Sequence, residues 1–272
     1  MLKSLESLTN MVVQATDGEI GSVEEFYFDD EKWTVRYLVV QTGGWLTGKK
    51  VLISPIAVEQ INVPARAIHV SLTRKQVEDS PSIDTDKPVS RQLEARYYDY
   101  YRWPYYWTGA GVWGMAPYPA GMLGRPPTSA SYASETAGTE TSANQESKGD
   151  PHLRSSDVVR GYRIEATDGR FGHVDDFIIE DDSWRIRYLV ADTVNFWPSK
   201  SVLISPEWVD SISWKDRKCR VNLAENVIKG SPEYLPGETI TRDYEERLYS
   251  HYGRPKYWSS ERSDASGKET AA

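Results

Sequence analysis

The chain has 272 residues, a formal net charge of −8, 39% hydrophobic residues and one cysteine. The length accommodates one or two domains, and the lean hydrophobic share indicates that part of the chain stays outside any core. The acidic balance makes nucleic acid an improbable partner, and the lone Cys219 excludes an intrachain disulfide and a multi-thiolate metal site.

Residues 1–10 lack the apolar stretch of a signal peptide. No apolar run approaches the roughly 20 residues that span a bilayer. We therefore expect a cytoplasmic protein with no membrane span.

The first part of the chain reads as short strands. Alternating or continuous apolar runs predict six of them, at 11–13, 20–28, 33–41, 50–54, 58–61 and 67–72. Asp17-Gly18 predicts the first turn, and Gly21 a bulge or a close backbone approach. Alternation places Trp33 and Tyr37 on one face, and the apolar second half of that strand indicates a central position. Six short strands in so few residues favour a small barrel over an open sheet.

Two short helices are predicted after the strands. Thr73 and Gln76 have the spacing of a capping box, although the second copy described below has Ala224 at the cap position. A second helix is expected from Ser90, with Thr241 as its equivalent cap.

The sequence repeats itself without a gap. The repeated segments are Ala15-Thr16-Asp17-Gly18 with Ala166-Thr167-Asp168-Gly169, Arg36-Tyr37-Leu38-Val39 with Arg187-Tyr188-Leu189-Val190, and Val51-Leu52-Ile53-Ser54-Pro55 with Val202-Leu203-Ile204-Ser205-Pro206. The match extends to Tyr106-Trp107 and Tyr257-Trp258. A period this long indicates two tandem domains, at 1–107 and 153–258. Gly, Pro, Ala, Ser and Thr dominate residues 108–152, and the stretch 128–150 is polar and low in complexity, which predicts a disordered linker, with a similar tail at 259–272. The apolar residues within 109–115 could contact a neighbouring domain.

Few residues of the sequence are candidates for catalysis or metal binding. Asp17 and Asp168 would suit acid–base work, but an Asp that makes its own turn is the favoured explanation. The acidic runs near 24–31 and 175–182 lack the ligand spacing of a calcium loop, and a solvated strand edge is favoured. The four histidines do not recur between copies, and Cys219 aligns with Ile68, which indicates a buried apolar role. No catalytic residue, cofactor or metal ligand is predicted, and an enzyme is not expected.

Repeated residues are the stronger candidates. Arg36 and Arg187 lie within apolar strands, where an ion pair with Glu24 or Asp175 is favoured over an anionic ligand. We assign a structural role to the repeated residues Asp17, Gly18, Gly21, Arg36, Asp168, Gly169, Gly172 and Arg187.

The segment 97–107 contains more aromatic residues than the core of a small domain requires. Tyr and Trp are enriched at protein interfaces, so a contact surface and packing on the segment's own barrel are equally favoured. The candidate interaction surface comprises Tyr97, Tyr100, Tyr101, Trp103, Tyr106, Trp107, Tyr252, Tyr257 and Trp258.

These motifs together resemble the PRC-barrel family. The resemblance rests on Asp17-Gly18, Gly21, Trp33, Arg36-Tyr37-Leu38-Val39 and Leu52-Ile53-Ser54-Pro55, and the aromatic close looks like that of bacterial proteins with two such barrels. It implies a mainly β protein with two six-stranded barrels, each followed by short helices. It also implies a fold shared with the cytoplasmic domain of the photosynthetic reaction-centre H subunit and with the C-terminal domain of the ribosome maturation factor RimM.

The resemblance implies an assembly or binding module and not an enzyme. We expect a non-catalytic interaction protein whose partner is another protein or a second copy of itself. The alternatives are a ribosome- or RNA-associated factor that resembles RimM, and an H-subunit-like accessory of photosynthetic electron transfer. The missing membrane helix and the acidic charge weigh against these two.

Overall fold

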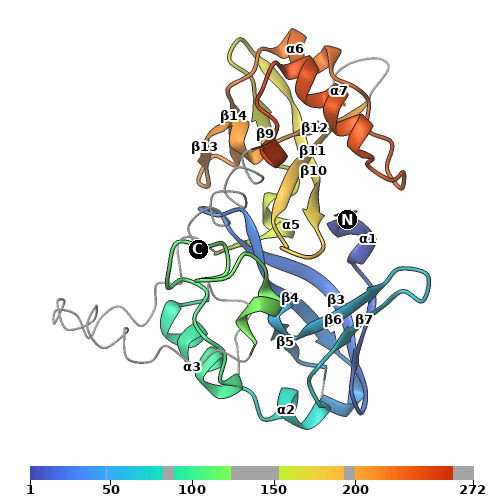
Figure 1. Ribbon diagram of the computed structural model, residues 1–272, viewed down its shortest axis with the longest axis vertical. Helices are drawn as coiled ribbons and strands as arrows, with labels where there is room; N and C mark the ends of the chain where they lie inside the picture. Colours follow the sequence, from blue (N-terminus) through green and yellow to red (C-terminus); the bar gives the residue numbers. More distant parts are fainter. Residues whose placement is uncertain (47, 82–88, 124–152, 193–199, 260–272) are drawn as a thin grey trace, which may run out of the picture. The chain divides into compact units, whose positions relative to one another are not determined.

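The computed structural model describes residues 1–46, 48–81, 89–123, 153–192 and 200–259 (Figure 1). The chain divides into two compact units. Unit 1 holds Met1, residues 3–159 and residues 177–187, and unit 2 holds Leu2 and the described residues of 160–176 and 188–259. Unit 1 is therefore discontinuous in sequence, because it includes a hairpin from the second repeat.

Unit 1 is built on one seven-stranded mixed sheet. The strands are β2 (Val12–Ala15), β3 (Gly18–Asp29), β4 (Thr34–Thr42), β5 (Lys50–Ile53), β6 (Val58–Asn62), β7 (Ala67–Val70) and β8 (Leu153–Ser155). The first six follow the order β5-β4-β3-β2-β7-β6, and β8 pairs with β3 outside this path. The six predicted strands are confirmed to within a few residues. The pairing of β8, from the start of the second repeat, with β3 was not predicted.

The predicted closure into a six-stranded barrel is wrong. The strand path ends at β5 and β6, and no pairing joins these two strands in the part of the chain that the structure describes. After β5, Ser54 caps a 3-10 turn (Pro55–Ala57) that redirects the chain. The carbonyl oxygen of Leu52 in β5 instead accepts a hydrogen bond, 2.6 Å long, from the Tyr97 hydroxyl. The aromatic segment therefore occupies part of the open edge.

The described part of unit 1 has four helices, namely α1 (Leu5–Leu8), α2 (Arg74–Glu78), α3 (Arg91–Tyr101) and α5 (Ser156–Val159). Of these, α2 and α3 begin at the predicted caps, whereas α1 and α5 were not predicted. Thr73 and Gln76 form the predicted capping box at α2, and the Ser90 hydroxyl caps α3. Figure 1 shows α2 and α3 beside the sheet of unit 1.

Strand β4 is buried on both faces, as its apolar second half predicts. Every residue of 34–40 is buried. Trp33, expected at the start of this strand, precedes it in the left-handed region with φ +48°, and its counterpart Trp184 has φ +59°. Bulky residues rarely adopt this conformation. Here the Trp33 carbonyl accepts from the Ile186 amide at 2.7 Å, and the Trp184 carbonyl accepts from the Val35 amide at 2.9 Å. The two β-hairpin turns are thus joined within unit 1.

The first part of the expected linker belongs to unit 1. Trp113 is fully buried and Met122, in a 3-10 turn (Pro119–Met122), is 2% exposed. The prediction of a disordered linker from residue 108 is therefore corrected for 108–123, because these residues contribute apolar side chains to the core. Residues 124–152 and 260–272 of the predicted linker and tail lie outside the described residues.

The second repeat forms a sheet with the same strand order. Its strands are β9 (Arg163–Glu165), β10 (Arg170–Glu180), β11 (Ile186–Asp192), β12 (Ser201–Ile204), β13 (Val209–Ser213) and β14 (Lys218–Val221), and β1 (Leu2–Ser4) pairs with β10. Their order is β12-β11-β10-β9-β14-β13, again with no pairing of the end strands in the described residues, so a second barrel is not formed either. The helices are α6 (Glu225–Gly230) and α7 (Arg242–Tyr252). Ala224 provides no side-chain cap for α6, and Thr241 caps α7, both as predicted.

Candidate functional site

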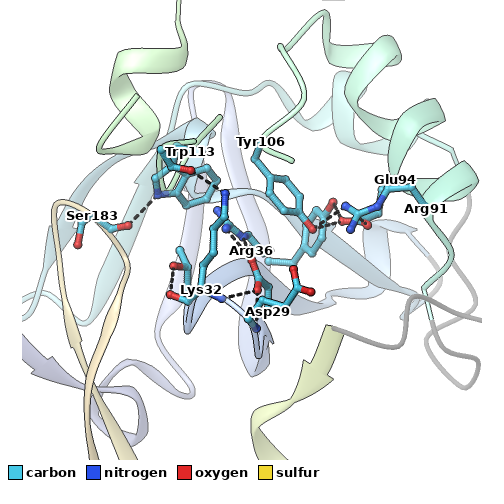
Figure 2. A network of polar contacts seen from close by, with 12 residues as sticks. Asp29, Lys32, Arg36, Arg91, Glu94, Tyr106, Trp113 and Ser183 are labelled. Atoms are coloured by element: carbon cyan, nitrogen blue, oxygen red, sulfur yellow. Dashed lines mark hydrogen bonds and ion pairs between the residues drawn. The ribbon is translucent and has the colours of Figure 1, made fainter. Parts of the chain in front are cut away.

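A buried polar network lies at the centre of unit 1 and contains charged residues that the sequence did not predict to be close together. Arg36 on β4 is fully buried. Its Nε and Nη2 donate to Asp29 Oδ2 at 3.1 and 2.7 Å. The other carboxylate oxygen, Oδ1, accepts from the backbone amides of Glu31 and Lys32. Asp29 thus fixes its own turn and neutralises the arginine at the same time (Figure 2).

Two aromatic rings enclose the Arg36 guanidinium. Its central carbon lies 4.0 Å from the ring centroid of Tyr106 and 4.7 Å from that of Trp113. The Trp113 indole donates to the carbonyl oxygen of Ser183 at 2.7 Å. Cation–π contacts of a desolvated arginine are worth about 2 kcal/mol. The network therefore attaches segment 108–123 to the sheet.

A second carboxylate, Glu94 on α3, lies on the other side of Tyr106 (Figure 2). Glu94 Oε1 accepts from the hydroxyls of Tyr37 at 2.7 Å and Tyr106 at 2.9 Å. Glu94 Oε2 pairs with Arg91 at 3.0 Å. Burial, and then the negative charge of Glu94, holds the pKa of the Tyr37 and Tyr106 hydroxyls well above the usual value. Both phenols therefore stay neutral donors.

Lys32 completes the network. Its ammonium donates to the carbonyl oxygen of Gly111 at 2.8 Å. Burial, together with the positive charge of Arg36, lowers the pKa of Lys32. The ammonium thus contributes a further link between the β3–β4 turn and segment 108–123.

The second repeat reproduces the glutamate–tyrosine part in unit 2. Glu245 Oε1 accepts from the hydroxyls of Tyr188 at 2.7 Å and Tyr257 at 3.0 Å. Glu245 Oε2 pairs with Arg242 at 2.9 Å, and the Arg242 guanidinium lies 4.2 Å from the Trp258 ring centroid. The repeat of this arrangement indicates that it is a feature of the fold.

The repeated arginines are in ion pairs, as favoured, but with other partners than expected. Arg36 pairs with Asp29, and Arg187 pairs with Glu180 at 2.6 Å. Glu24, the predicted partner, lies 2.9 Å from Lys50 instead. The real partners precede the arginines across the β-hairpin turn, a geometry that strand alternation does not show. Asp29, only 7% exposed, is also not the solvated residue that the acidic run predicted.

The turn aspartates do more than make their own turns. Asp17 Oδ1 accepts from the Arg74 amide, and Asp168 Oδ1 accepts from the Glu225 amide, both at 2.7 Å. Each aspartate thus satisfies the first amide of the following helix, α2 or α6, which has no partner inside the helix. The favoured explanation was incomplete, because it placed these bonds within the turn.

The repeated glycines have steric roles. A Cβ built on Gly21 would lie 2.0 Å from the Gln41 carbonyl oxygen, which confirms the predicted close approach. Gly18 has φ +144°, and a Cβ on Gly169 would lie 2.7 Å from Glu225 Oε2. Gly172 lines a pocket in unit 2.

The aromatic candidates lie mostly inside the units. Five of them are buried, namely Tyr97, Trp103, Tyr106, Tyr252 and Tyr257. Three are partly exposed, namely Tyr101, Trp107 and Trp258. Tyr100 is 38% exposed. Rings stack on each other, as in the Tyr101–Trp103 pair with centroids 4.6 Å apart. Most of these side chains therefore pack within their own unit, and the interaction surface that the whole set would form stays a prediction.

Sequence reasoning missed Asp29, Glu94 and Trp113 as central residues. Glu94 recurs in the second repeat as Glu245, and this recurrence could have identified Glu94 as a candidate. Cys219 is buried as expected, and burial raises the pKa of its thiol to about 12. No group of His, Cys, Asp and Glu in the described ranges is arranged to hold a metal ion. Among the described helices, none has the length and apolar character to cross a membrane.

This geometry defines a β-sheet module whose polar centre holds the module together. The family model of the PRC-barrel domain matches residues 3–77, from β1 into α2. A PRC-barrel domain, a general module, is thus present in the first repeat. No curated protein matches the chain.

Proposed function

We propose that the protein is a non-catalytic interaction or assembly module built from two PRC-type domains, one in each repeat. One observation carries this proposal. The charged groups at the centre of unit 1 form hydrogen bonds and ion pairs with other groups of the same unit, so their role is to stabilise its fold. The equal strand order of the two sheets supports a second domain of the same type.

The contact surface that we propose differs from the aromatic segment as a whole. Three apolar side chains within residues 115–123 are exposed, namely Met115 at 73%, Tyr118 at 49% and Leu123 at 52%. They follow Trp113, which anchors this segment to the buried network. A segment that is fixed at one point and apolar outside is suited to bind another protein, since ordering it on binding costs little entropy.

The test compares two triple variants of the full chain. Met115→Ser/Tyr118→Ser/Leu123→Ser removes the proposed contacts, and Val63→Ser/Val158→Ser/Leu235→Ser alters three other exposed apolar residues as a control. Affinity capture from the native host and light scattering of the purified protein report on a partner and on self-association. We expect the first variant alone to lose the association. The proposed surface would be rejected if both variants associate as strongly as the unaltered chain. It would also be rejected if the unaltered chain associates with nothing.

A further inference from the structure

Basic residues gather on the solvent-facing side of three neighbouring strands in unit 2. On β10 and β9, His173 lies opposite Arg163, and Arg170 lies opposite Glu165. On β14, which is parallel to β9, Lys218 lies beside Arg163 and Arg220 beside Glu165. Residues paired in this way point to the same side of a sheet. We call Arg163, Arg170, His173, Lys218 and Arg220 the basic face.

Part of the basic face surrounds an open pocket. The pocket has a volume of about 390 Å³ and is lined by Gly161, Arg163, Arg170, Gly172 and His173. A Cβ on Gly161 would meet no atom within 4 Å, so the pocket is open at this residue. Arg163 and Arg170 are exposed. Within the described part of the chain, neither has a carboxylate at ion-pair distance, so both guanidinium groups face the pocket side of the sheet without a counter-charge.

The one carboxylate inside the face is already neutralised. Glu165 Oε1 lies 2.7 Å from the Lys218 ammonium, and Glu165 Oε2 lies 3.6 Å from Arg220. The hydrogen bond from Lys218 lowers the pKa of Glu165. A second acid, Asp175, follows His173 by two residues and does not line the pocket. The net charge of the residues around the pocket is therefore positive, whereas the net charge of the whole chain is −8.

The fold does not require these charges. The first repeat has the same strands with the same register, and Val12, Glu19 and Ser22 occupy the positions of Arg163, Arg170 and His173. Ala67 and His69 occupy those of Lys218 and Arg220. Because the first repeat forms its sheet with one acid and one histidine at these positions, the basic face is a property of the second copy alone.

We propose that this pocket binds a phosphate group of a small ligand or of a lipid headgroup. Two arginines supply planar forks of N–H donors, which match the oxygen geometry of phosphate, and their joint charge matches a dianion. His173, which lies opposite Arg163, adds a ring N–H donor. The volume is in the range of small-ligand sites and fits a phosphate or diphosphate group. This inference goes beyond the proposed interaction function and is independent of it.

The experiment measures binding of inorganic pyrophosphate to the full chain by titration calorimetry at low ionic strength. Sedimentation with phosphatidylcholine vesicles, with and without phosphatidic acid, forms the second arm. Arg163→Gln/Arg170→Gln removes the forks, and Arg96→Gln/Arg102→Gln, two exposed arginines of unit 1, makes the same change in net charge as a control. Both sites are exposed, so circular dichroism melting curves should coincide with that of the unaltered chain.

We expect pyrophosphate or the phosphatidic acid vesicles to bind, and the Arg163/Arg170 variant to lose at least about tenfold in affinity, since a charge-assisted hydrogen bond contributes a tenfold factor or more. The control variant should bind like the unaltered chain. Loss in the pyrophosphate arm identifies a small ligand, and loss in the vesicle arm alone identifies a headgroup. Absence of binding in both arms, or equal binding by the two variants, overturns the proposal.

Discussion

The Arg36 guanidinium and the Asp29 carboxylate form an ion pair 2.7 Å long in which the arginine side chain has no exposed surface. Burial of two charges is offset only when both are well paired, and removal of one partner costs about 3–5 kcal/mol because the other charge is left uncompensated. This pair is therefore a sensitive point of unit 1.

We predict that Asp29→Ala lowers the free energy of unfolding by about 3–5 kcal/mol. The partly exposed pair of Glu24 and Lys50 provides the control, and Glu24→Ala should cost clearly less, about 1 kcal/mol. Urea unfolding followed by circular dichroism measures both. Replacing both partners, in Asp29→Ala/Arg36→Met, should recover part of the loss, and equal costs for Asp29→Ala and Glu24→Ala would contradict the buried pair.

Trp113→Ala should destabilise unit 1 by about 3–5 kcal/mol, because a fully buried indole, its hydrogen bond to Ser183 and its contact with Arg36 are lost together. Limited proteolysis should then cut within 108–123 faster than in the unaltered chain. Met115→Ala, at a side chain that is 73% exposed, is the control and should leave the proteolysis rate unchanged. Similar rates for both variants would show that this segment is not anchored.

Gly21→Ala should prevent stable folding of unit 1. The added methyl group would lie 2.0 Å from a backbone carbonyl oxygen in β4, which has no room to shift. Overpacking typically costs about 1–3 kcal/mol, and a collision with a backbone atom lies at the upper end of this range or above it. Gly44→Ala meets no atom within 4 Å and should be neutral. Thermal melting distinguishes the two, and a Gly21→Ala protein as stable as Gly44→Ala would refute the close approach.

Ala224→Thr should stabilise the protein by about 0.5–1 kcal/mol, because it gives α6 the side-chain cap that Thr73 gives α2. The backbone at Ala224, with φ −78° and ψ 148°, already has the extended conformation of a cap. Thermal melting measures the gain. Thr73→Ala is the reciprocal control and should lose a similar amount.

Stability should fall in alkaline solution. Burial raises the pKa of Tyr101, Tyr249 and Tyr252 to about 12. An unfolded tyrosine ionises near pH 10. Because the folded pKa is the higher one, this contribution to stability is fully present below about pH 10 and is lost between about pH 10 and 12. Circular dichroism and phenolate absorbance should change together in that window. Ionisation of the whole set of tyrosines near pH 10 with no change in fold would contradict the buried hydroxyls.

Local signals predicted the elements of this fold well. The six strands of the first repeat and the caps Thr73, Ser90 and Thr241 depend on residues close in sequence, and all were confirmed. Closure of the sheet was predicted wrongly, because it depends on whether β5 and β6 meet in space. A strand count does not contain that information.

The candidate site was harder to predict, for two physical reasons. Arg36 finds its partner across a β-hairpin turn and its aromatic neighbours in residues 106 and 113, which no periodicity connects. The basic face occurs in one copy only, so the comparison of repeats that highlighted Arg36 led away from Arg163 and Arg170.

The discontinuity of unit 1 has a consequence for biosynthesis. Its sheet includes β8, and its hairpin contact is complete only with residues 177–187. A ribosome adds roughly 5–20 residues per second. After Leu123 has been added, several seconds pass before Arg187 follows. During this time β3 lacks its neighbour β8, and the Phe28 ring lacks the Phe177 ring, whose centroid lies 5.4 Å away in the folded unit. A chaperone that acts on nascent chains would therefore meet the first repeat before its sheet is complete.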